Sequence, residues 1–246
     1  MTDRVAIVTG AGSGLGQGIA LALAEAGADI VGVYGSKISD TEEKVKALGR
    51  KFLGIQANLM SIEPVENIVK KTVETFGKID ILVNNAGIIK RADALDFTEE
   101  DWDDVMNINL KTVFFLCQAA AREFIRQGTG GKIINIASML SFQGGVRVPS
   151  YTASKSGLAG ITKLMANEWA RHNINVNAIA PGYMATDNTA ELRSDEDRQS
   201  EILSRIPAGR WGTAQDLMGA SVFLASSASD YINGHILAVD GGWLAR

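Results

Sequence analysis

Seven short apolar runs alternate along the chain with longer segments that have helical periodicity. The runs are Val5–Val8, Ile30–Val33, Phe52–Ile55, Ile79–Val83, Lys132–Ile136, Ile174–Ile179 and Ile236–Val239. The helical segments carry apolar residues three and four apart and are Leu15–Ala26, Asp40–Leu48, Ile62–Phe76, Glu99–Arg126, Tyr151–Arg171 and Ala214–Ala225. Continuous apolar strands that alternate with helices are typical of a parallel sheet covered on both faces. The pattern therefore predicts an α/β fold with a doubly wound, seven-stranded parallel sheet.

The 246 residues are expected to form one domain, because no linker rich in Pro, Gly or Ser and no repeat divides them. One polar and charged stretch, at about 183–207, interrupts the alternation between the sixth and seventh predicted strands. We expect this stretch to form a small helical lid inserted into the domain.

Composition excludes several classes of protein. The chain has 28 acidic against 24 basic residues, which disfavours a nucleic-acid partner. No apolar run approaches the roughly 18 residues of a membrane span, and no signal peptide is visible. The single cysteine, Cys117, cannot form an internal disulfide, and His172 and His235 lie far apart in sequence. We therefore expect no metal site, no membrane and a cytoplasmic location.

A glycine-rich loop follows the first predicted strand and runs directly into a helix. It reads Thr9-Gly10-Ala11-Gly12-Ser13-Gly14-Leu15-Gly16 and differs from the common G-x-G-x-x-G spacing, because Leu15 stands where that spacing needs glycine. Glycines let the backbone approach a pyrophosphate, and the helix N-terminus offers unpaired N–H groups to it. A tight turn without a ligand would explain the glycines alone. The place after the first strand of a doubly wound sheet favours nucleotide binding.

Three polar residues form a candidate reaction centre. Tyr151 and Lys155 are one helical turn apart, so their side chains share a face, and an ammonium there would favour the tyrosine phenolate. Ser138 lies just beyond the fifth strand, at the sheet edge where the glycine loop also lies. The pair alone could equally be a solvated helix face. With Ser138, it is a plausible general-acid site.

These motifs together resemble the short-chain dehydrogenase/reductase family over essentially the whole chain. The ordered set is Thr9-Gly10-x-x-x-Gly14-x-Gly16, Asn84-Asn85-Ala86-Gly87, Asn109, Ser138, Tyr151-x-x-x-Lys155 and Pro181-Gly182. The resemblance implies a Rossmann-type fold, NAD(P)-dependent transfer of hydride between a nicotinamide and a carbonyl or secondary alcohol carbon, and a homotetramer.

The resemblance also implies roles for four catalytic residues. Ser138 would hydrogen-bond the substrate oxygen, and Tyr151 would donate the proton. Lys155 would lower the pKa of Tyr151 and hold the nicotinamide ribose, while Asn109 would position a water in the proton relay. The implied cofactor contacts are Gly10, Gly12, Ser13, Gly14, Leu15, Gly16, Tyr34, Asn58, Leu59, Asn85, Ala86, Gly87, Tyr151, Lys155, Pro181, Gly182 and Thr186.

The preferred coenzyme is expected to be NAD rather than NADP. A 2′-phosphate calls for a cation, and the positions where relatives that prefer NADP often carry one hold Ser13 and Gly35, which leaves Lys37 as the nearby candidate. Two departures bear on this. Tyr34 stands where NAD-preferring relatives usually have an Asp, and Asn58 stands where relatives often have one near the adenine.

Two stretches, Lys132–Pro181 and Val239–Arg246, resemble more closely the bacterial members that act on keto-deoxy sugar acids. The implied reaction is reduction of 2,5-diketo-3-deoxy-gluconate to 2-keto-3-deoxygluconate and the reverse oxidation, in hexuronate and pectin catabolism. The alternatives are another short-chain reductase, such as one for 3-oxoacyl thioesters, and a non-catalytic dinucleotide-binding sensor.

A sugar acid must have its carboxylate bound near the reacting ketone. Arg147 lies between Ser138 and Tyr151, and Arg91 follows the fourth strand at the same sheet edge, so both guanidinium groups are candidates. They could instead be solvated loop residues or subunit contacts. The candidate substrate residues are Arg91, Ser138, Gln143, Arg147 and Tyr151.

Overall fold

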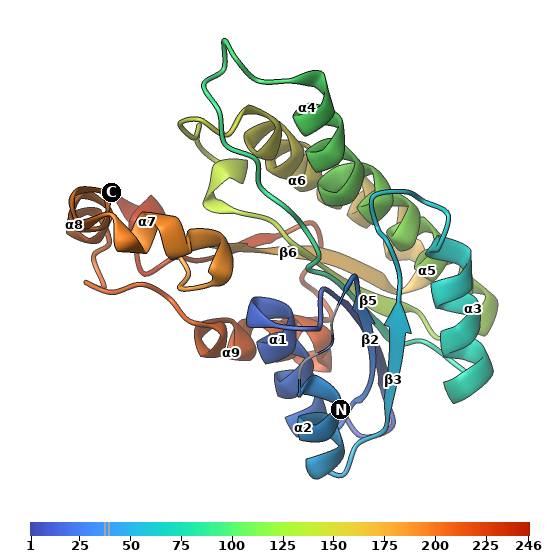
Figure 1. Ribbon diagram of the computed structural model, residues 1–246. Coiled ribbons are helices and arrows are strands. Elements are labelled where there is room, and N and C mark those ends of the chain that lie inside the picture. The colour runs from blue at the N-terminus through green and yellow to red at the C-terminus, as the bar shows by residue number, and fades with distance from the viewer. Residues whose placement is uncertain (37, 39) are drawn as a thin grey trace.

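A single seven-stranded sheet organises the chain (Figure 1). The computed structural model describes residues 1–36, 38 and 40–246; Lys37, the candidate cation for a 2′-phosphate, lies outside the described residues. The strands, all parallel, are β1 Val5–Thr9, β2 Asp29–Tyr34, β3 Phe52–Gln56, β4 Ile81–Asn84, β5 Gly131–Ile136, β6 Ile174–Pro181 and β7 Ile236–Val239. Their order, β3-β2-β1-β4-β5-β6-β7, is that of a Rossmann-type doubly wound sheet and confirms the predicted fold class.

Helices cover both faces of this sheet (Figure 1). On one face lie α1 Gly14–Glu25, α2 Thr41–Ala47 and α9 Ala214–Ala225. On the other lie α3 Val65–Phe76, α4 Glu99–Met106, α5 Thr112–Gln127 and α6 Pro149–Trp169. Strand β1 shows why its first four residues are all apolar: Val5 and Ile7 belong to the core beneath α3, α5 and α6, whereas Ala6 and Val8 belong to the core beneath α1 and α9. Successive side chains of a strand point to opposite faces, so a strand covered on both sides carries apolar residues at consecutive positions.

Two boundaries differ from the predictions. The predicted helix Glu99–Arg126 is divided by a π-helical turn at Asn107–Lys111 between α4 and α5. Strand β4 begins at Ile81 rather than Ile79, because the Ile79 N–H donates to the Gln127 side chain at 2.9 Å instead of entering the sheet. The apolar pattern cannot reveal the π-helical turn, because its residue types are those of an ordinary helix. It cannot reveal the start of β4 either, because that start depends on the distant side chain of Gln127.

The segment 183–207, predicted as a lid, contains the 3-10 turn Asp187–Thr189 and the helices α7 Ala190–Ser194 and α8 Glu196–Arg205. These elements lie beside the C-terminus of the chain, at the end of the sheet where the strands finish (Figure 1). Ile202, Ile206 and Trp243 are buried together there with Met139, in a core separate from the two that flank the sheet. Over the described residues, none of the helices combines the length and the apolar character needed to cross a membrane.

Candidate active site

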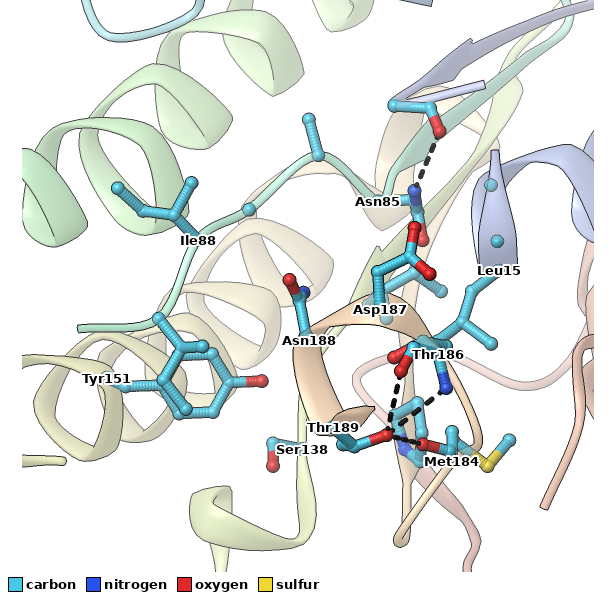
Figure 2. Close-up of a pocket in the computed structure, with 18 of the residues that line it drawn as sticks. Leu15, Asn85, Ile88, Ser138, Tyr151, Met184, Thr186, Asp187, Asn188 and Thr189 are labelled. Atoms are coloured by element: carbon cyan, nitrogen blue, oxygen red, sulfur yellow. Dashed lines mark hydrogen bonds between the residues drawn. The ribbon is translucent and has the colours of Figure 1, made fainter. Parts of the chain in front are cut away.

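A cavity of about 380 Å³ opens at the carboxyl ends of the central strands (Figure 2). It receives residues from the ends of β1, β4, β5 and β6, from the start of α6 and from the segment after β6. Open parallel sheets bind ligands outside the carboxyl ends of their strands, where the chain order reverses. The lining residues are Gly10, Ser13, Gly14, Leu15, Gly16, Asn85, Ala86, Gly87, Ile88, Ile89, Arg91, Ile136, Ala137, Ser138, Tyr151, Lys155, Pro181, Gly182, Met184, Thr186, Asp187, Asn188 and Thr189.

The glycine loop forms one wall of the cavity with backbone alone. Gly10 has a φ of +67°, and a Cβ there would lie 2.7 Å from Asn85 Nδ2. A Cβ on Gly16 would overlap the carbonyl oxygen of Gly10. Helix α1 begins at Gly14, so its free N–H groups face the space that the missing side chains leave open. This wall fits the pyrophosphate of a dinucleotide.

Hydrogen bonds tie the loop after β4 to the end of β1. The Thr9 hydroxyl accepts the N–H groups of Asn85 and Ala86, each at 3.0 Å, and Asn85 Nδ2 donates to the Thr9 carbonyl at 3.0 Å. Asn85 Nδ2 also donates to the Gly10 carbonyl at 3.4 Å (Figure 2). Thr9 is buried and belongs to the sheet. The predicted cofactor residues Asn85 and Ala86 are therefore held rigidly against the glycine loop.

A second, smaller hollow of about 230 Å³ adjoins the loop on the side of β2 and β3. It contains the predicted residues Tyr34, Asn58 and Leu59, together with Gly10 and Ala86, which also line the main cavity. No acidic or basic side chain of the described residues lines this hollow. Its position and apolar character fit the adenosine half of a dinucleotide. Of the predicted cofactor residues, Gly12 lines neither hollow.

Ser138, Tyr151 and Lys155 line the cavity opposite the glycine loop. Ser138 is the second residue after β5, and its hydroxyl accepts the Leu140 N–H at 3.1 Å. Tyr151 stands in the first turn of α6, and Figure 2 shows its hydroxyl directed into the cavity toward Asn188, with Ser138 nearby. Lys155, one turn later, donates to the Ile136 carbonyl at 2.6 Å, and its Nζ lies 5.5 Å from the centre of the Tyr151 ring.

Burial controls the ionisation of this pair. It raises the pKa of Tyr151, and the Ser138 hydroxyl and then the Arg91 charge act in the opposite direction without overcoming it. Burial also lowers the pKa of Lys155 to about 8. The direction of the Tyr151 shift is set by desolvation, which outweighs the Ser138 hydrogen bond and the Arg91 charge, and Lys155 is not among its causes. At neutral pH, Tyr151 is a proton donor.

Asn109 lies behind the cavity wall, in the π-helical turn. Its Oδ1 accepts the Ile88 N–H and its Nδ2 donates to the Ile88 carbonyl, both at 2.9 Å, and Nδ2 also contacts Ser154 Oγ at 3.3 Å. Gly87 makes this possible, since a Cβ there would lie 2.9 Å from Asn109 Oδ1. Asn109 thus fixes the cavity-lining segment at Ile88. The π-helical turn, of a kind frequent at functional sites, supplies the side chain at this point.

The predicted substrate residues are divided by the structure. Arg91 lines the cavity, and its Nη2 donates to the Asn188 carbonyl at 2.9 Å. Arg147 does not line the cavity; its side chain is 62% exposed, and its Nε pairs with Asp93 at 2.9 Å. The nearness in sequence to Ser138 and Tyr151 was misleading because the residue turns outward at a φ of +61°. Gln143 also lies outside the lining and accepts a hydrogen bond from Trp243 Nε1 at 3.3 Å.

Sequence reasoning missed the polar residues that the lid segment brings to the cavity, Asp187, Asn188 and Thr189. Thr189 Oγ1 donates to the Met184 carbonyl at 2.6 Å and accepts the Thr186 N–H at 3.2 Å, which closes the turn at the cavity mouth (Figure 2). The spacing of Thr186 and Thr189 was an available signal, because threonine pairs three residues apart cap short helical turns. Among the described residues, no group of three or more His, Cys, Asp or Glu side chains could hold a metal ion.

A family model described as enoyl-(acyl carrier protein) reductase matches residues 10–244. The chain belongs to the short-chain dehydrogenase/reductase family and is an oxidoreductase, as the ordered motifs predicted.

Individual relatives are similar over nearly their full lengths. The chain is 68% identical to 2-dehydro-3-deoxy-D-gluconate 5-dehydrogenase of Escherichia coli (strain K12), over 99% of this chain and 96% of the relative. A solved structure from Agrobacterium tumefaciens with bound NADP is 52% identical, with a TM-score of 0.95 over 100% of this chain and 98% of the other. A gluconate 5-dehydrogenase from Burkholderia cenocepacia J2315, solved in complex with NADP and tartrate, is 39% identical with a TM-score of 0.95 over 100% and 97% of the two chains.

Proposed function

We propose that this chain catalyses the reaction of 2-dehydro-3-deoxy-D-gluconate 5-dehydrogenase, the reversible reduction of 2,5-diketo-3-deoxy-gluconate to 2-keto-3-deoxygluconate with NAD(P)H. The observation that carries the proposal is that Ser138, Tyr151 and Lys155 line one cavity with the glycine loop. The 68% identity to a relative of that name supports the choice of substrate.

In the reducing direction, Tyr151 acts as the general acid. The bound nicotinamide supplies hydride to the carbonyl carbon in reduction and accepts it in oxidation. Ser138 hydrogen-bonds the carbonyl oxygen and holds it beside the Tyr151 hydroxyl, which gives its proton to that oxygen as negative charge develops. The ketone becomes a secondary alcohol, and Tyr151 is left as phenolate until a proton returns from solvent. The raised pKa of Tyr151 keeps it protonated for this step at neutral pH.

Lys155 and Asn109 support proton donation by Tyr151. The Lys155 ammonium, still largely charged at pH 7, stabilises the phenolate that forms, and it would hold the nicotinamide ribose of a bound dinucleotide. Its hydrogen bond to the Ile136 carbonyl fixes the side chain beneath the Tyr151 ring. Asn109 holds the cavity wall at Ile88, and a role in ordering a relay water remains part of the proposal.

Arg91 is the residue that we assign to the substrate carboxylate. It reaches the cavity with a guanidinium of which one donor is engaged by the Asn188 carbonyl, and guanidinium groups match carboxylates with paired hydrogen bonds. Lys90, the neighbouring cation, pairs instead with Asp101 and Asp104.

NADH is the proposed coenzyme in preference to NADPH. The support is that the described residues around the adenosine hollow include no cation to receive a 2′-phosphate. They also include no carboxylate to bind the ribose hydroxyls, so the preference is expected to be modest, and related structures contain NADP.

A homotetramer in the cytoplasm completes the proposal. Exposed apolar side chains on α4, α5 and α6, namely Trp102, Ile125 and Leu164, offer a surface for subunit contacts. Cys117 is buried, its pKa raised by burial to about 12, which suits an unreactive thiol in a reducing compartment. Light scattering on the purified protein measures the number of subunits.

Steady-state assays with NADH and NADPH against keto sugar acids, simple ketones and 3-oxoacyl thioesters test the function. We expect the highest kcat/KM for 2,5-diketo-3-deoxy-gluconate with NADH. Activity confined to acyl thioesters would contradict the substrate, and a higher kcat/KM with NADPH would contradict the coenzyme. Dinucleotide binding without turnover of any carbonyl would favour the sensor alternative.

A further inference from the structure

The 3-10 turn Asp187–Thr189 brings polar side chains to the cavity that the proposed mechanism does not use. All three of its residues line the cavity. The Thr189 hydroxyl is occupied within the turn, because it donates to the Met184 carbonyl at 2.6 Å. The side-chain amide of Asn188, in contrast, makes no hydrogen bond to any residue that the structure describes. Its two N–H donors and its oxygen are therefore available to a ligand.

Two guanidinium groups fix the backbone of this turn. Arg91 Nη2, from the segment after β4, donates to the Asn188 carbonyl at 2.9 Å. Arg193 Nη2, from α7, donates to the Thr186 carbonyl at 3.0 Å. Because both bonds end on backbone oxygens, they hold Asn188 in place without occupying its side chain. The amide is thus presented to the cavity from a fixed point.

The side chains of Asp187 and Asn188 lie toward different halves of the cavity. Figure 2 shows the Asp187 carboxylate on the side of Asn85, which belongs to the dinucleotide half. It shows the Asn188 amide on the side of Ile88, and the Tyr151 hydroxyl is directed toward the same residue (Figure 2). Asn188 therefore places a neutral donor and acceptor in the substrate half.

Asn188 stands between the residue that protonates the ketone and the residue assigned to the carboxylate. The Tyr151 hydroxyl is directed toward Asn188, and Arg91 contacts its backbone. In 2,5-diketo-3-deoxy-gluconate, the reacting C5 ketone and the C1 carboxylate are separated by a chain that carries a hydroxyl at C4 and a keto oxygen at C2. A substrate that extends from Tyr151 to Arg91 brings these oxygens past the Asn188 amide. An amide N–H can donate to either oxygen, and the amide oxygen can accept from the hydroxyl.

We propose that Asn188 is a specificity residue, whose amide binds the oxygen groups that the sugar acid carries between its reacting ketone and its carboxylate. This inference rests on the proposed function and deepens it, because it names the part of the substrate that the lid recognises. A ketone without oxygens at these positions gains nothing from the amide.

Asn188→Ala tests the assignment, since it removes the amide and keeps the backbone carbonyl that Arg91 binds. We expect KM for 2,5-diketo-3-deoxy-gluconate to rise about 3- to 10-fold, the scale of one neutral hydrogen bond. The dissociation constant of NADH, measured by fluorescence titration, and the melting temperature stay unchanged, because the glycine loop and the bonds of the turn are retained.

The matched ligand is 6-hydroxy-5-oxohexanoate. It keeps the carboxylate, the ketone and the terminal hydroxyl at the same spacing but has no oxygen between the ketone and the carboxylate. Its inhibition constant as a competitor of the sugar acid measures its binding, whether or not the enzyme reduces it. Asn188→Ala is expected to leave this constant unchanged, so the preference of the wild type for the sugar acid shrinks by the factor that KM gains.

Asn67→Ala is the control variant, because it removes an exposed amide on α3 that lines neither hollow, and it is expected to change none of these quantities. An unchanged KM for the sugar acid in Asn188→Ala, or an equal loss of binding for both ligands, overturns the assignment of Asn188 and leaves the proposed function intact. A wild-type enzyme that reduces no sugar acid overturns the proposed function itself, and this inference with it.

Discussion

The two halves of the cavity are built by different means. The half beside β1 consists of backbone and small side chains, with Gly10 and Gly16 at positions that a Cβ would fill and with Thr9 joined to Asn85 by hydrogen bonds of 3.0 Å. The half beside α6 and the lid depends on long side chains such as Arg91. Its guanidinium donates to the carbonyl of Asn188, a residue 97 positions later in the sequence.

The half beside β1 can therefore bind a dinucleotide whatever the substrate is, whereas the half beside α6 can be adjusted to one substrate. Backbone N–H groups at a helix N-terminus recognise a phosphate irrespective of what the enzyme reduces. Guanidinium and amide groups on loops can instead be matched to one substrate, because their placement depends on few neighbours. Substitutions in the two halves are therefore expected to affect dinucleotide affinity and substrate KM separately.

Tyr151 stands between the halves, and its loss is expected to have the largest effect. Tyr151→Phe removes the proton donor and keeps the ring, so kcat falls by about 100- to 10,000-fold, the range for general acid catalysis. The NADH dissociation constant changes little, because the glycine loop is untouched. Stopped-flow turnover and fluorescence titration measure the two quantities.

Tyr231→Phe serves as the control, because Tyr231 is fully exposed at the far end of the sheet, near the loop before β7, and a lost hydroxyl there affects neither quantity. Retention of more than a tenth of the wild-type kcat in Tyr151→Phe would place the proton donor elsewhere.

The two arginines sharpen the comparison within the substrate half. Arg91→Met is expected to raise KM for the keto acid about 10-fold or more, since a hydrogen bond to a charged group contributes about 1.5–3 kcal/mol. Arg147→Met is expected to change it by less than about 2-fold, because the exposed pair with Asp93 is screened by solvent. NADH affinity stays unchanged in both variants.

The methyl ester of the substrate provides the decisive comparison for Arg91. If Arg91 binds the carboxylate, Arg91→Met weakens binding of the acid far more than binding of the ester. Equal weakening of both, or a larger effect in Arg147→Met than in Arg91→Met, contradicts the assignment.

The same contrast explains how far the sequence could lead. All seven strands, the glycine loop and the place of Ser138, Tyr151 and Lys155 at one sheet edge follow from local patterns, because strand alternation and a requirement for glycine are written in neighbouring residues. Arg147 could not be placed, because its direction depends on a single backbone φ and on Asp93 in another loop. The sign of the pKa shift of Tyr151 depends on burial by the whole fold, which no local pattern contains.

The π-helical turn at Asn107–Lys111 shows a further limit. Its residues continue the helical periodicity of the flanking segments, so the predicted helix was continuous. One turn of wider spacing is nevertheless what carries Asn109 to both polar atoms of the Ile88 peptide unit. A hydrophobic pattern indicates which face of a helix is buried. It does not indicate where the backbone hydrogen bonds change from the i→i+4 spacing of an α-helix to the i→i+5 spacing of a π-helix.

The smallest effect that we predict is a change of stability with pH, and it comes from the ionisation of Lys155. Burial lowers its pKa from 10.5 to about 8, so the folded protein releases the proton near pH 8 and the unfolded chain near pH 10.5. Between these values the unfolded state binds more protons, and stability must rise with pH. The cost of the buried charge is fully present at pH 7, at about 3 kcal/mol by the pKa difference, and is largely gone at pH 10.

Lys155→Met removes this cost at every pH and leaves the Ile136 carbonyl without its donor. The melting temperature of the variant minus that of the wild type is therefore expected to fall between pH 7 and pH 10, by about 5 °C for a chain of this size. Lys163→Met, an exposed position on the same helix, should give a difference that is the same at both pH values. A difference for Lys155→Met that is equally constant, or one that grows with pH, would mean that Lys155 is not held as a desolvated cation beneath Tyr151.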